Sequence, residues 1–342
     1  MARLTVVSFR LGGTDGVSIE ADKWIHAFRA LGHDVTTLAG DGTADVIMPE
    51  LAIRAAREPN LGDLSNALKD ADVVVVENVT SLPLNVAARE GLYRVLEGRP
   101  ALFRHHDLAW QRPSSIDNDA PRDGANWSHV TINDLSRREL AERGLAAQTI
   151  RNTFDCDPPR GRRERTRSAL HVGDEDSVLL FPTRAIPRKN VAGALALAES
   201  LDAVLWLLGP PEDGYGDTLI ELVANSHARV VTGLPKGLDI HDAYTGADLV
   251  VMPSTWEGFG NPVLESVTHH RPLAVYRYPV LEEIASFGFR FFTLEDVGPI
   301  GSFLKEPDEG LLNRNASIAR EHFNIVDLPA KLQPVLEALG VK

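Results

Sequence analysis

The chain has 342 residues, of which 44% are hydrophobic and 24% charged, and its formal net charge is −13. This length exceeds one typical hydrophobic core and predicts two domains. The acidic balance argues against a nucleic-acid partner, and the single cysteine, Cys156, excludes an intrachain disulfide and a cysteine-rich metal site. No apolar run is long enough for a transmembrane segment, and the N-terminus lacks a long signal-peptide core. We therefore expect a cytoplasmic protein.

The first half alternates apolar runs with polar or glycine-rich turns. Leu4–Phe9 is predicted to be a strand, and Ser18 is predicted to cap a helix that extends to about Leu31. The turn between them carries three glycines but is not G-x-G-x-x-G, which disfavours a dehydrogenase. The glycines could make a tight turn only, but we favour a backbone surface that a phosphate or an acceptor approaches. Further strands are predicted at Val35–Ala39, Val73–Val76, Ala101–Phe103, Val130–Ile132 and Thr149–Asn152.

Polar residues gather where several of these strands end, which suggests a lined cleft. His105 and His106 follow one strand directly and precede Asp107. A lone histidine is more often structural than catalytic. Alternation along a strand sends two neighbouring side chains to opposite faces, so one histidine is expected to face the cleft while the other packs. The nearby sequence offers no further metal ligands.

The second half repeats the alternation of strands and helices. The arginine-rich residues 157–168 are predicted to connect two domains and to begin a helix, because a nucleic-acid patch without interleaved aromatics in an acidic chain is disfavoured. Strands are predicted at Val178–Phe181, Val204–Leu208, Arg229–Thr232, Leu249–Met252 and Leu273–Tyr276. Helices are predicted from Asn190 to about Ser200 and at Ile240–Thr245, Pro279–Phe287, Leu311–Phe323 and Val326–Leu339.

A glycine-rich turn follows the strand Leu249–Met252, and we expect Asn261 to cap the next helix, with Pro262 in its first position. Exposed turn amides and a helix N-terminus make an anion site at the carboxyl end of a parallel strand. Glu257 and Glu265 bracket this site. One acid alone could complement the helix dipole or lie in solvent. Two acids beside an anion site favour hydrogen bonds to sugar hydroxyls.

The run from Glu257 to Glu265, Glu-Gly-Phe-Gly-Asn-Pro-Val-Leu-Glu, resembles the E-x7-E motif of retaining GT-B glycosyltransferases of family 4, the group 1 type. The stretch from Gly13 to Trp24 is more weakly similar to the mannosylglucosylglycerate synthases of that family. The resemblance implies an α/β chain with the GT-B fold, in which two Rossmann-like doubly wound domains face each other across a cleft. Residues 1–157 would bind the acceptor and residues 158–325 the nucleotide sugar, and a terminal helix in 326–342 would cross back to the first domain.

The resemblance also implies roles for individual residues. Arg184 and Lys189 match a cationic pair that contacts the donor phosphates, whereas Arg188 is expected to be a solvated loop charge. His106, in preference to His105, matches a histidine near the transferred sugar. The implied catalytic residues are His106, Arg184, Lys189 and Glu257; the donor-binding residues are Gly12, Gly13, Gly258, Phe259, Gly260, Asn261 and Glu265; the acceptor-binding residues are Thr14, Asp15, Glu20 and Lys23.

The implied activity is transfer of a hexosyl group, with retention, from a nucleotide diphosphate sugar of the GDP-mannose or UDP-glucose type to a hydroxyl of a small-molecule or glycan acceptor. No cofactor and no metal are expected. The Asp-x-Asp match Asp174-Glu175-Asp176 precedes a strand and is interpreted as a solvated turn. Two alternatives remain: a GT-B-like sugar-nucleotide epimerase, which needs no acceptor, and a non-catalytic nucleotide-sugar-binding protein.

Overall fold

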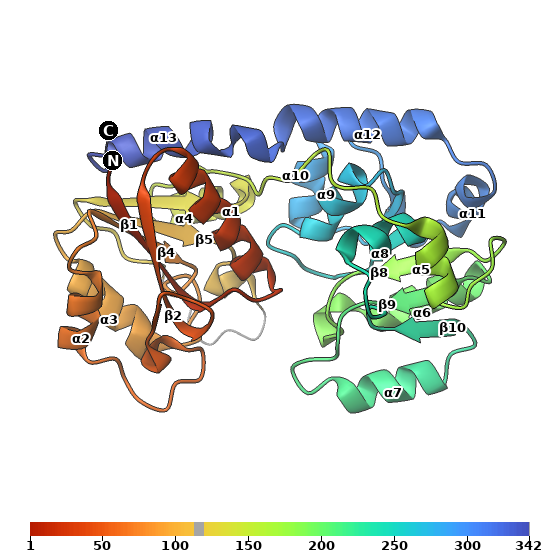
Figure 1. The fold of residues 1–342 in the computed structure, drawn as a ribbon, viewed down its shortest axis with the longest axis horizontal. Helices are drawn as coiled ribbons and strands as arrows, with labels where there is room; N and C mark the ends of the chain where they lie inside the picture. Colours follow the sequence, from red (N-terminus) through yellow and green to blue (C-terminus); the bar gives the residue numbers. More distant parts are fainter. Residues whose placement is uncertain (113–119, 342) are drawn as a thin grey trace. The chain divides into compact units, whose positions relative to one another are not determined.

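A computed structural model describes residues 1–112 and 120–341. The chain forms two compact units, each built around one parallel sheet (Figure 1). Unit 1 comprises Met1–Thr153 with Ile325–Lys342, and unit 2 comprises Phe154–Asn324. None of the helices that the structure describes combines the length and the apolar character needed to cross a bilayer.

The sheet of unit 1 has seven strands in the order β3-β2-β1-β4-β5-β6-β7. The order reverses between β1 and β4, which makes the carboxyl ends of these two strands a topological switch point, where open sheets bind ligands. Val73–Val76 of β4 are fully buried, as the continuous apolar run predicted. The strands are β1 Arg3–Leu11, β2 Asp34–Gly42, β3 Val46–Ile47, β4 Val73–Glu77, β5 Ala101–His105, β6 Trp127–Thr131 and β7 Gln148–Thr149.

The first four helices of unit 1 begin after residues whose side chains cap them. Helix α1 is capped by Asp15, whose Oδ1 accepts from the backbone amides of Val17 and Ser18 at 3.1 Å. The prediction that Ser18 is the cap is therefore wrong. The other carboxylate oxygen of Asp15 accepts from the Ser18 hydroxyl at 2.8 Å, so Ser18 supports the capping residue and is not the cap itself. The helices are α1 Gly16–Ala30, α2 Leu61–Leu68, α3 Val86–Leu96, α4 Asp134–Glu142 and α13 Leu328–Ala338, with short 3-10 turns at Pro49–Leu51, Ala109–Gln111 and Ile325–Asp327.

The last helix belongs to the core of unit 1 although it follows unit 2 in the chain. Leu332 and Val335 of α13 are fully buried and share one hydrophobic cluster with Trp24 and Phe28 of α1. The predicted helix Val326–Leu339 is shorter in the structure, because a 3-10 turn precedes Leu328.

The sheet of unit 2 has six strands in the order β10-β9-β8-β11-β12-β13. It reverses between β8 and β11, again creating a switch point. Buried residues of α6 and α11 pack together on one face of this sheet. The strands are β8 Val178–Phe181, β9 Val204–Leu207, β10 Arg229–Thr232, β11 Leu249–Met252, β12 Leu273–Val275 and β13 Phe292–Thr293; the helices are α5 Arg163–Ala169, α6 Val191–Ser200, α7 Gly216–Ala224, α8 Ile240–Gly246, α9 Asn261–Thr268, α10 Pro279–Ala285, α11 Val297–Lys305 and α12 Glu309–His322, and a 3-10 turn spans Pro187–Lys189.

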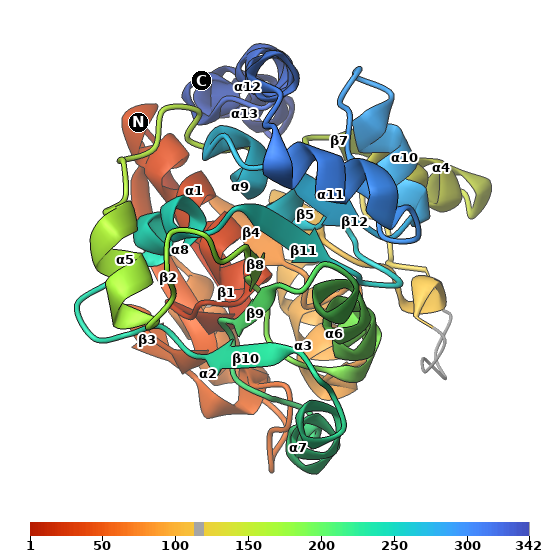
Figure 2. The ribbon, with the colours of Figure 1, turned by 90° about the vertical axis from the view of Figure 1, so that its right-hand side faces the viewer.

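The arginine-rich segment folds within unit 2. Helix α5 lies beside α8, as Figure 2 shows. Arg162 binds Asp242, and Arg163 and Arg167 bind Asp248 at 2.5 and 3.1 Å. These three arginines are therefore paired with two acids of the same unit.

Candidate active site

The turn between β11 and α9 depends on Gly260. This residue has φ +87° and precedes the helix as its cap, so Asn261 is the first helical residue and its prediction as the cap is wrong. A Cβ atom at position 260 would lie 2.4 Å from the hydroxyl of Tyr278, which leaves room for glycine only. That hydroxyl donates to the carbonyl of Phe259 at 3.1 Å and fixes the turn. The side chain of Phe259 is 3% exposed and stacks on Phe154, so a bound donor would meet the backbone here.

Two cations hold Glu257 in this turn. Lys189 donates to Oε1 at 2.5 Å, and Arg188 donates to Oε2 at 2.9 Å and to the carbonyl of Trp256 at 3.0 Å. The side chains of Lys189 and Glu257 are both 8% exposed. The prediction of Arg188 as a solvated loop charge is therefore wrong, because this guanidinium closes the turn onto the loop after β8.

The charges of this cluster stabilise the ionised acid. Burial alone raises the pKa of Glu257, but Lys189 and Arg188 outweigh it and lower the pKa to about 2. Burial lowers the pKa of Lys189, and the neighbouring Glu257 opposes that shift. A carboxylate and two cations therefore lie in the turn that precedes the N-terminus of α9. This combination suits a ligand that carries both hydroxyls and phosphates.

Arg184 lies in the same loop with a different partner. Its guanidinium binds Glu212 at 2.5 Å, and the two side chains are 37% and 41% exposed. The positive charge of Arg184 lies close enough to the Lys189 ammonium to help lower the pKa of Lys189. The loop after β8 therefore carries three cations, of which two bind Glu257 and one binds Glu212.

Glu265 is oriented by a tyrosine. Tyr244 of α8 is fully buried and donates to Oε2 of Glu265 at 2.6 Å. Burial, with a contribution from Glu265, raises the pKa of Tyr244 well above its usual value, so the phenol keeps its proton. His269 stacks on the Tyr244 ring at 4.5 Å and binds the carbonyl of Glu265 at 2.7 Å. Sequence reasoning missed Tyr244, because no local motif links residues 21 positions apart.

The two neighbouring histidines of unit 1 have different partners. His105 is fully buried, where its Nδ1 meets the Ser81 hydroxyl at 2.7 Å and its Nε2 meets Nδ1 of His129 at 3.0 Å. His106 binds Oε2 of Glu77 through Nε2 at 2.8 Å. Burial lowers the pKa of His105 well below its ordinary value, which makes it a neutral packing residue.

Glu20 and Lys23, predicted to bind an acceptor, bind each other at 2.6 Å. Lys23 also donates to the carbonyl of Thr153 at 2.7 Å. Glu20 is 1% exposed and meets the buried guanidinium of Arg104 through Oε2 at 3.4 Å. An acceptor would thus reach the partly exposed ammonium of Lys23 more readily than the carboxylate of Glu20.

The remaining predicted residues lie in the turn after β1. Gly12 has φ +69°, and a Cβ there would lie 2.8 Å from Cβ of Thr43. At Gly13 a Cβ would lie 2.9 Å from the Asp15 carboxylate. Thr14 is exposed, whereas the carboxylate of Asp15 is engaged as the cap of α1.

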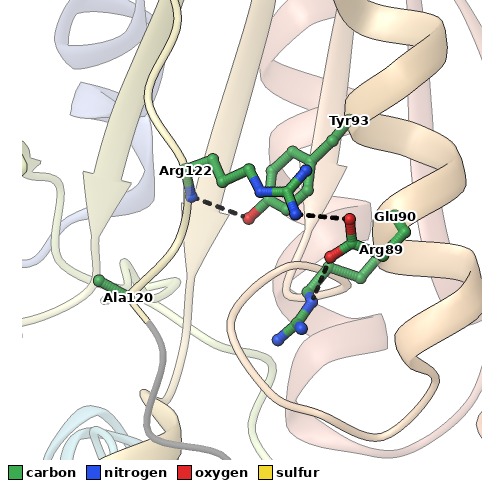
Figure 3. A pocket seen from close by; sticks show the side chains of 5 residues that line it. All are labelled: Arg89, Glu90, Tyr93, Ala120 and Arg122. Carbon is green, nitrogen blue, oxygen red and sulfur yellow. Dashed lines mark hydrogen bonds and ion pairs between the residues drawn. The ribbon is translucent and has the colours of Figure 1, made fainter.

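A pocket of about 240 Å³ lies elsewhere in unit 1 and contains none of the predicted site residues (Figure 3). It is lined by Arg89, Glu90, Tyr93, Ala120 and Arg122. Glu90 pairs with Arg122 at 2.6 Å and with Arg89 at 3.4 Å, and the backbone amide of Arg122 donates to the Tyr93 hydroxyl at 3.1 Å. Glu90 therefore already pairs with the two arginines that an anionic ligand would have to bind.

Within the described residues, no group of three or more His, Cys, Asp and Glu side chains is arranged to hold a metal ion. The Asp-x-Asp match at residues 174–176 precedes β8, at the amino end of that strand. Its Asp176 accepts from the amide of Gly173 at 2.7 Å and pairs with Arg229 at 3.4 Å, so it serves the turn itself.

The sequence of unit 2 matches the family model of glycosyl transferases group 1 over residues 162–295. Residues 162–295 are a group 1 glycosyltransferase segment. This segment includes Arg184, Lys189, Glu257 and Glu265, which are the residues that carried the resemblance.

Two curated relatives that match most of this chain carry the name mannosylglucosylglycerate synthase. The protein from Petrotoga mobilis is 28% identical over an alignment of 371 positions. The alignment covers 84% of this chain and 86% of the relative. The protein from Thermotoga maritima is 25% identical over 385 residues, with coverages of 91% and 89%.

Solved structures show the fold. HepE of Anabaena in complex with UDP-glucose superimposes with a TM-score of 0.77 at 15% identity, covering 99% of this chain and 100% of that one. Sucrose-phosphate synthase from Thermosynechococcus elongatus gives 0.72 at 13% identity, with 99% of each chain covered. The predicted α/β fold is confirmed: the chain has two Rossmann-like units and the GT-B fold.

Proposed function

We propose that this glycosyltransferase moves a hexosyl group, with retention, from a nucleotide diphosphate sugar to a hydroxyl of a small-molecule acceptor. The observation that carries the proposal is the position of Glu257, between Lys189 and Arg188 in the turn that leads into α9. A purely structural ion pair would not need a left-handed glycine and a helix N-terminus beside it, whereas a phosphorylated sugar uses all of these groups.

The leaving group would be a nucleotide diphosphate, whose β-phosphate gains charge as the glycosidic bond breaks. Lys189 and Arg184, together with the amides of the turn at Gly258–Asn261, would stabilise this charge. Lys189 has three N–H donors, so it can bind Glu257 and a phosphate oxygen at the same time. The helix N-terminus adds a positive dipole end.

The two glutamates would hold the sugars at either side of the diphosphate. Glu265, with its carboxylate fixed by Tyr244, would accept from the ribose hydroxyls, and Glu257 would accept from hydroxyls of the transferred sugar. His106 of unit 1 would contact the transferred sugar. Attack by the acceptor hydroxyl on the face that the phosphate leaves would let the departing phosphate take the proton, so no protein nucleophile is required.

The names of the relatives favour a class of substrate. Since two mannosylglucosylglycerate synthases match most of this chain, we propose a glycosylated glycerate as the acceptor, with Thr14, Glu20 and Lys23 on its side. GDP-mannose and UDP-glucose are the donors to test first, the second because HepE was solved with UDP-glucose.

A thermal-shift panel of GDP, UDP and ADP, with their mannose and glucose conjugates, tests the donor site. A nucleotide that binds only the folded protein raises its melting temperature. We expect one base to stabilise the wild type and the same nucleotide to lose this effect in Glu265→Ala. A panel in which no nucleotide or nucleotide sugar shifts the melting temperature at millimolar concentration would contradict the proposal.

A further inference from the structure

Unit 1 contains a buried charged network whose Arg104 and Glu77 have no role in the proposed function. Arg104 of β5 and Glu77 of β4 are each 0% exposed, and Glu20 of α1 is 1% exposed. Arg104 donates through Nη1 to Oε1 of Glu77 at 3.3 Å and through Nη2 to Oε2 of Glu20 at 3.4 Å and to the Asn152 side chain at 3.2 Å. Its guanidinium also lies 4.1 Å from the ring centre of Trp24.

Such a network is an inefficient way to stabilise a core. Removing charged groups from water is costly, and well-packed apolar residues often stabilise a core equally well. The network does, however, fix the orientation of its side chains. Arg104 is held on several sides, and it holds Oε1 of Glu77 in turn, so the second oxygen of Glu77 has a fixed direction.

That second oxygen binds His106. The distance from Oε2 of Glu77 to Nε2 of His106 is 2.8 Å. The backbone of His106 is fixed as well, because its amide donates to the Asn78 side chain at 3.0 Å, and Asn78 itself adopts φ +61°. Both the ring and the main chain of this histidine are therefore set by residues at the end of β4.

The contact determines which ring nitrogen carries the proton. Burial raises the pKa of Glu77, but Arg104 and His106 outweigh it and lower the pKa, so the group is a carboxylate at neutral pH. A carboxylate can only accept a hydrogen bond, so Nε2 must donate. In the neutral ring, Nδ1 then carries the lone pair and can accept a hydrogen bond.

We propose that Glu77, held by Arg104, is a positioning residue that keeps the proton of His106 on Nε2 and presents Nδ1 as an acceptor for a substrate hydroxyl. The role of Nδ1 rests on the proposed function, in which His106 meets the transferred sugar. The assignment of the proton does not, and it can be measured without any substrate.

The experiment compares Glu77→Gln with the matched control Glu20→Gln. Both variants remove one buried carboxylate that faces Arg104, but only the first touches His106. In Glu77→Gln the amide oxygen is expected to face Arg104 and the NH₂ group to face His106, which forces the lone pair onto Nε2 and the proton onto Nδ1. Long-range ¹H–¹⁵N spectra of histidine-labelled protein distinguish the two tautomers, and a His106→Asn sample assigns the signal.

We expect the wild type and Glu20→Gln to show the Nε2–H tautomer, and Glu77→Gln to show the Nδ1–H tautomer. With the donor and acceptor identified, Glu77→Gln should lower kcat by about 100-fold while the KM of the donor changes little. An Nδ1–H tautomer in the wild type overturns the proposal whether or not the variants fold. An unchanged tautomer in folded Glu77→Gln, or a wild-type kcat in it, also overturns the proposal. A wild type that transfers no sugar contradicts the proposed function but leaves the tautomer result standing.

Discussion

Lys189 donates a hydrogen bond to Glu257 across 2.5 Å, and both side chains are 8% exposed. The two residues are 68 positions apart and come from the loops that follow β8 and β11, the neighbouring strands at the switch point of unit 2. Their pairing brings the cation proposed for the phosphates next to the acid proposed for the sugar. The site in unit 2 is therefore assembled before a donor arrives.

The stability of unit 2 should reveal this pairing. Lys189→Met leaves the buried charge of Glu257 with Arg188 as its cationic partner, and Glu257→Gln leaves the ammonium of Lys189 without its carboxylate. Each variant should therefore lower the free energy of unfolding by about 3–5 kcal/mol. The double variant should lose less than the sum of the two single losses, because it removes both charges. Denaturant unfolding measures all three, and strictly additive losses would show that the pair does not interact.

Glu265 should determine recognition of the ribose. Glu265→Ala is expected to weaken nucleotide binding by about 1–3 kcal/mol, since ribose hydroxyls lose their acceptor. Tyr244→Phe should weaken it by a smaller amount, because the carboxylate loses its orientation but not its charge. Calorimetry with the preferred nucleoside diphosphate and its 2′-deoxy analogue checks the cause: the wild type should prefer the ribonucleotide, and Glu265→Ala should not. A variant that keeps the full preference would remove Glu265 from the ribose site.

Acid should destabilise the protein through His129. Burial lowers the pKa of His129 to about 4, whereas the unfolded residue titrates near 6.5. Between these values the unfolded chain takes up a proton that the folded chain does not, so stability falls as the pH drops from about 6.5 to about 4. The loss attributable to this residue is on the order of 3 kcal/mol.

The control for this effect is His129→Gln, which keeps a polar side chain beside His105 but does not titrate. Unfolding curves recorded at several pH values should be flatter for the variant in this window. Equal slopes for the two proteins would show that His129 is not the group responsible. Half-buried His269, whose pKa burial also lowers to about 4, should leave a residual slope in both.

Turnover should not require a divalent metal. Arg184 and Lys189 can neutralise the donor diphosphate through charge-assisted hydrogen bonds, and Asp176 of the match at residues 174–176 binds within its own turn. Activity should therefore survive excess chelator, and Arg184→Ala and Lys189→Ala should each lower it by about 100-fold or more. Activity that disappears on chelation and returns with magnesium or manganese would overturn this account of leaving-group stabilisation.

Local patterns were sufficient for most strands and for the outline of unit 2. Val178–Phe181, Arg229–Thr232 and Leu249–Met252 were predicted with their observed bounds, because each is a short apolar run between polar turns. Helices such as α4, whose composition is largely polar, and α7 were not predicted.

The contacts across the sheet could not be read from the sequence. Arg188 was assigned to solvent because its partner, Glu257, lies 69 residues away, and Glu77 and Tyr244 carry no local motif. The caps differed for a related reason. Asp15 and Gly260 replace the predicted Ser18 and Asn261, because the path of the chain into each helix decides which residue occupies the cap.

Analysis of the product tests the central claim most directly. The protein is incubated with GDP-mannose or UDP-glucose and a glycosylated glycerate, and ¹H NMR follows the anomeric signals, with Lys189→Ala as the inactive control. We expect a new glycoside whose anomeric configuration equals that of the donor, formed together with the free nucleoside diphosphate. A nucleotide sugar that changes configuration without acceptor, or one that binds and is never consumed with any acceptor, would contradict the assignment as a retaining hexosyltransferase.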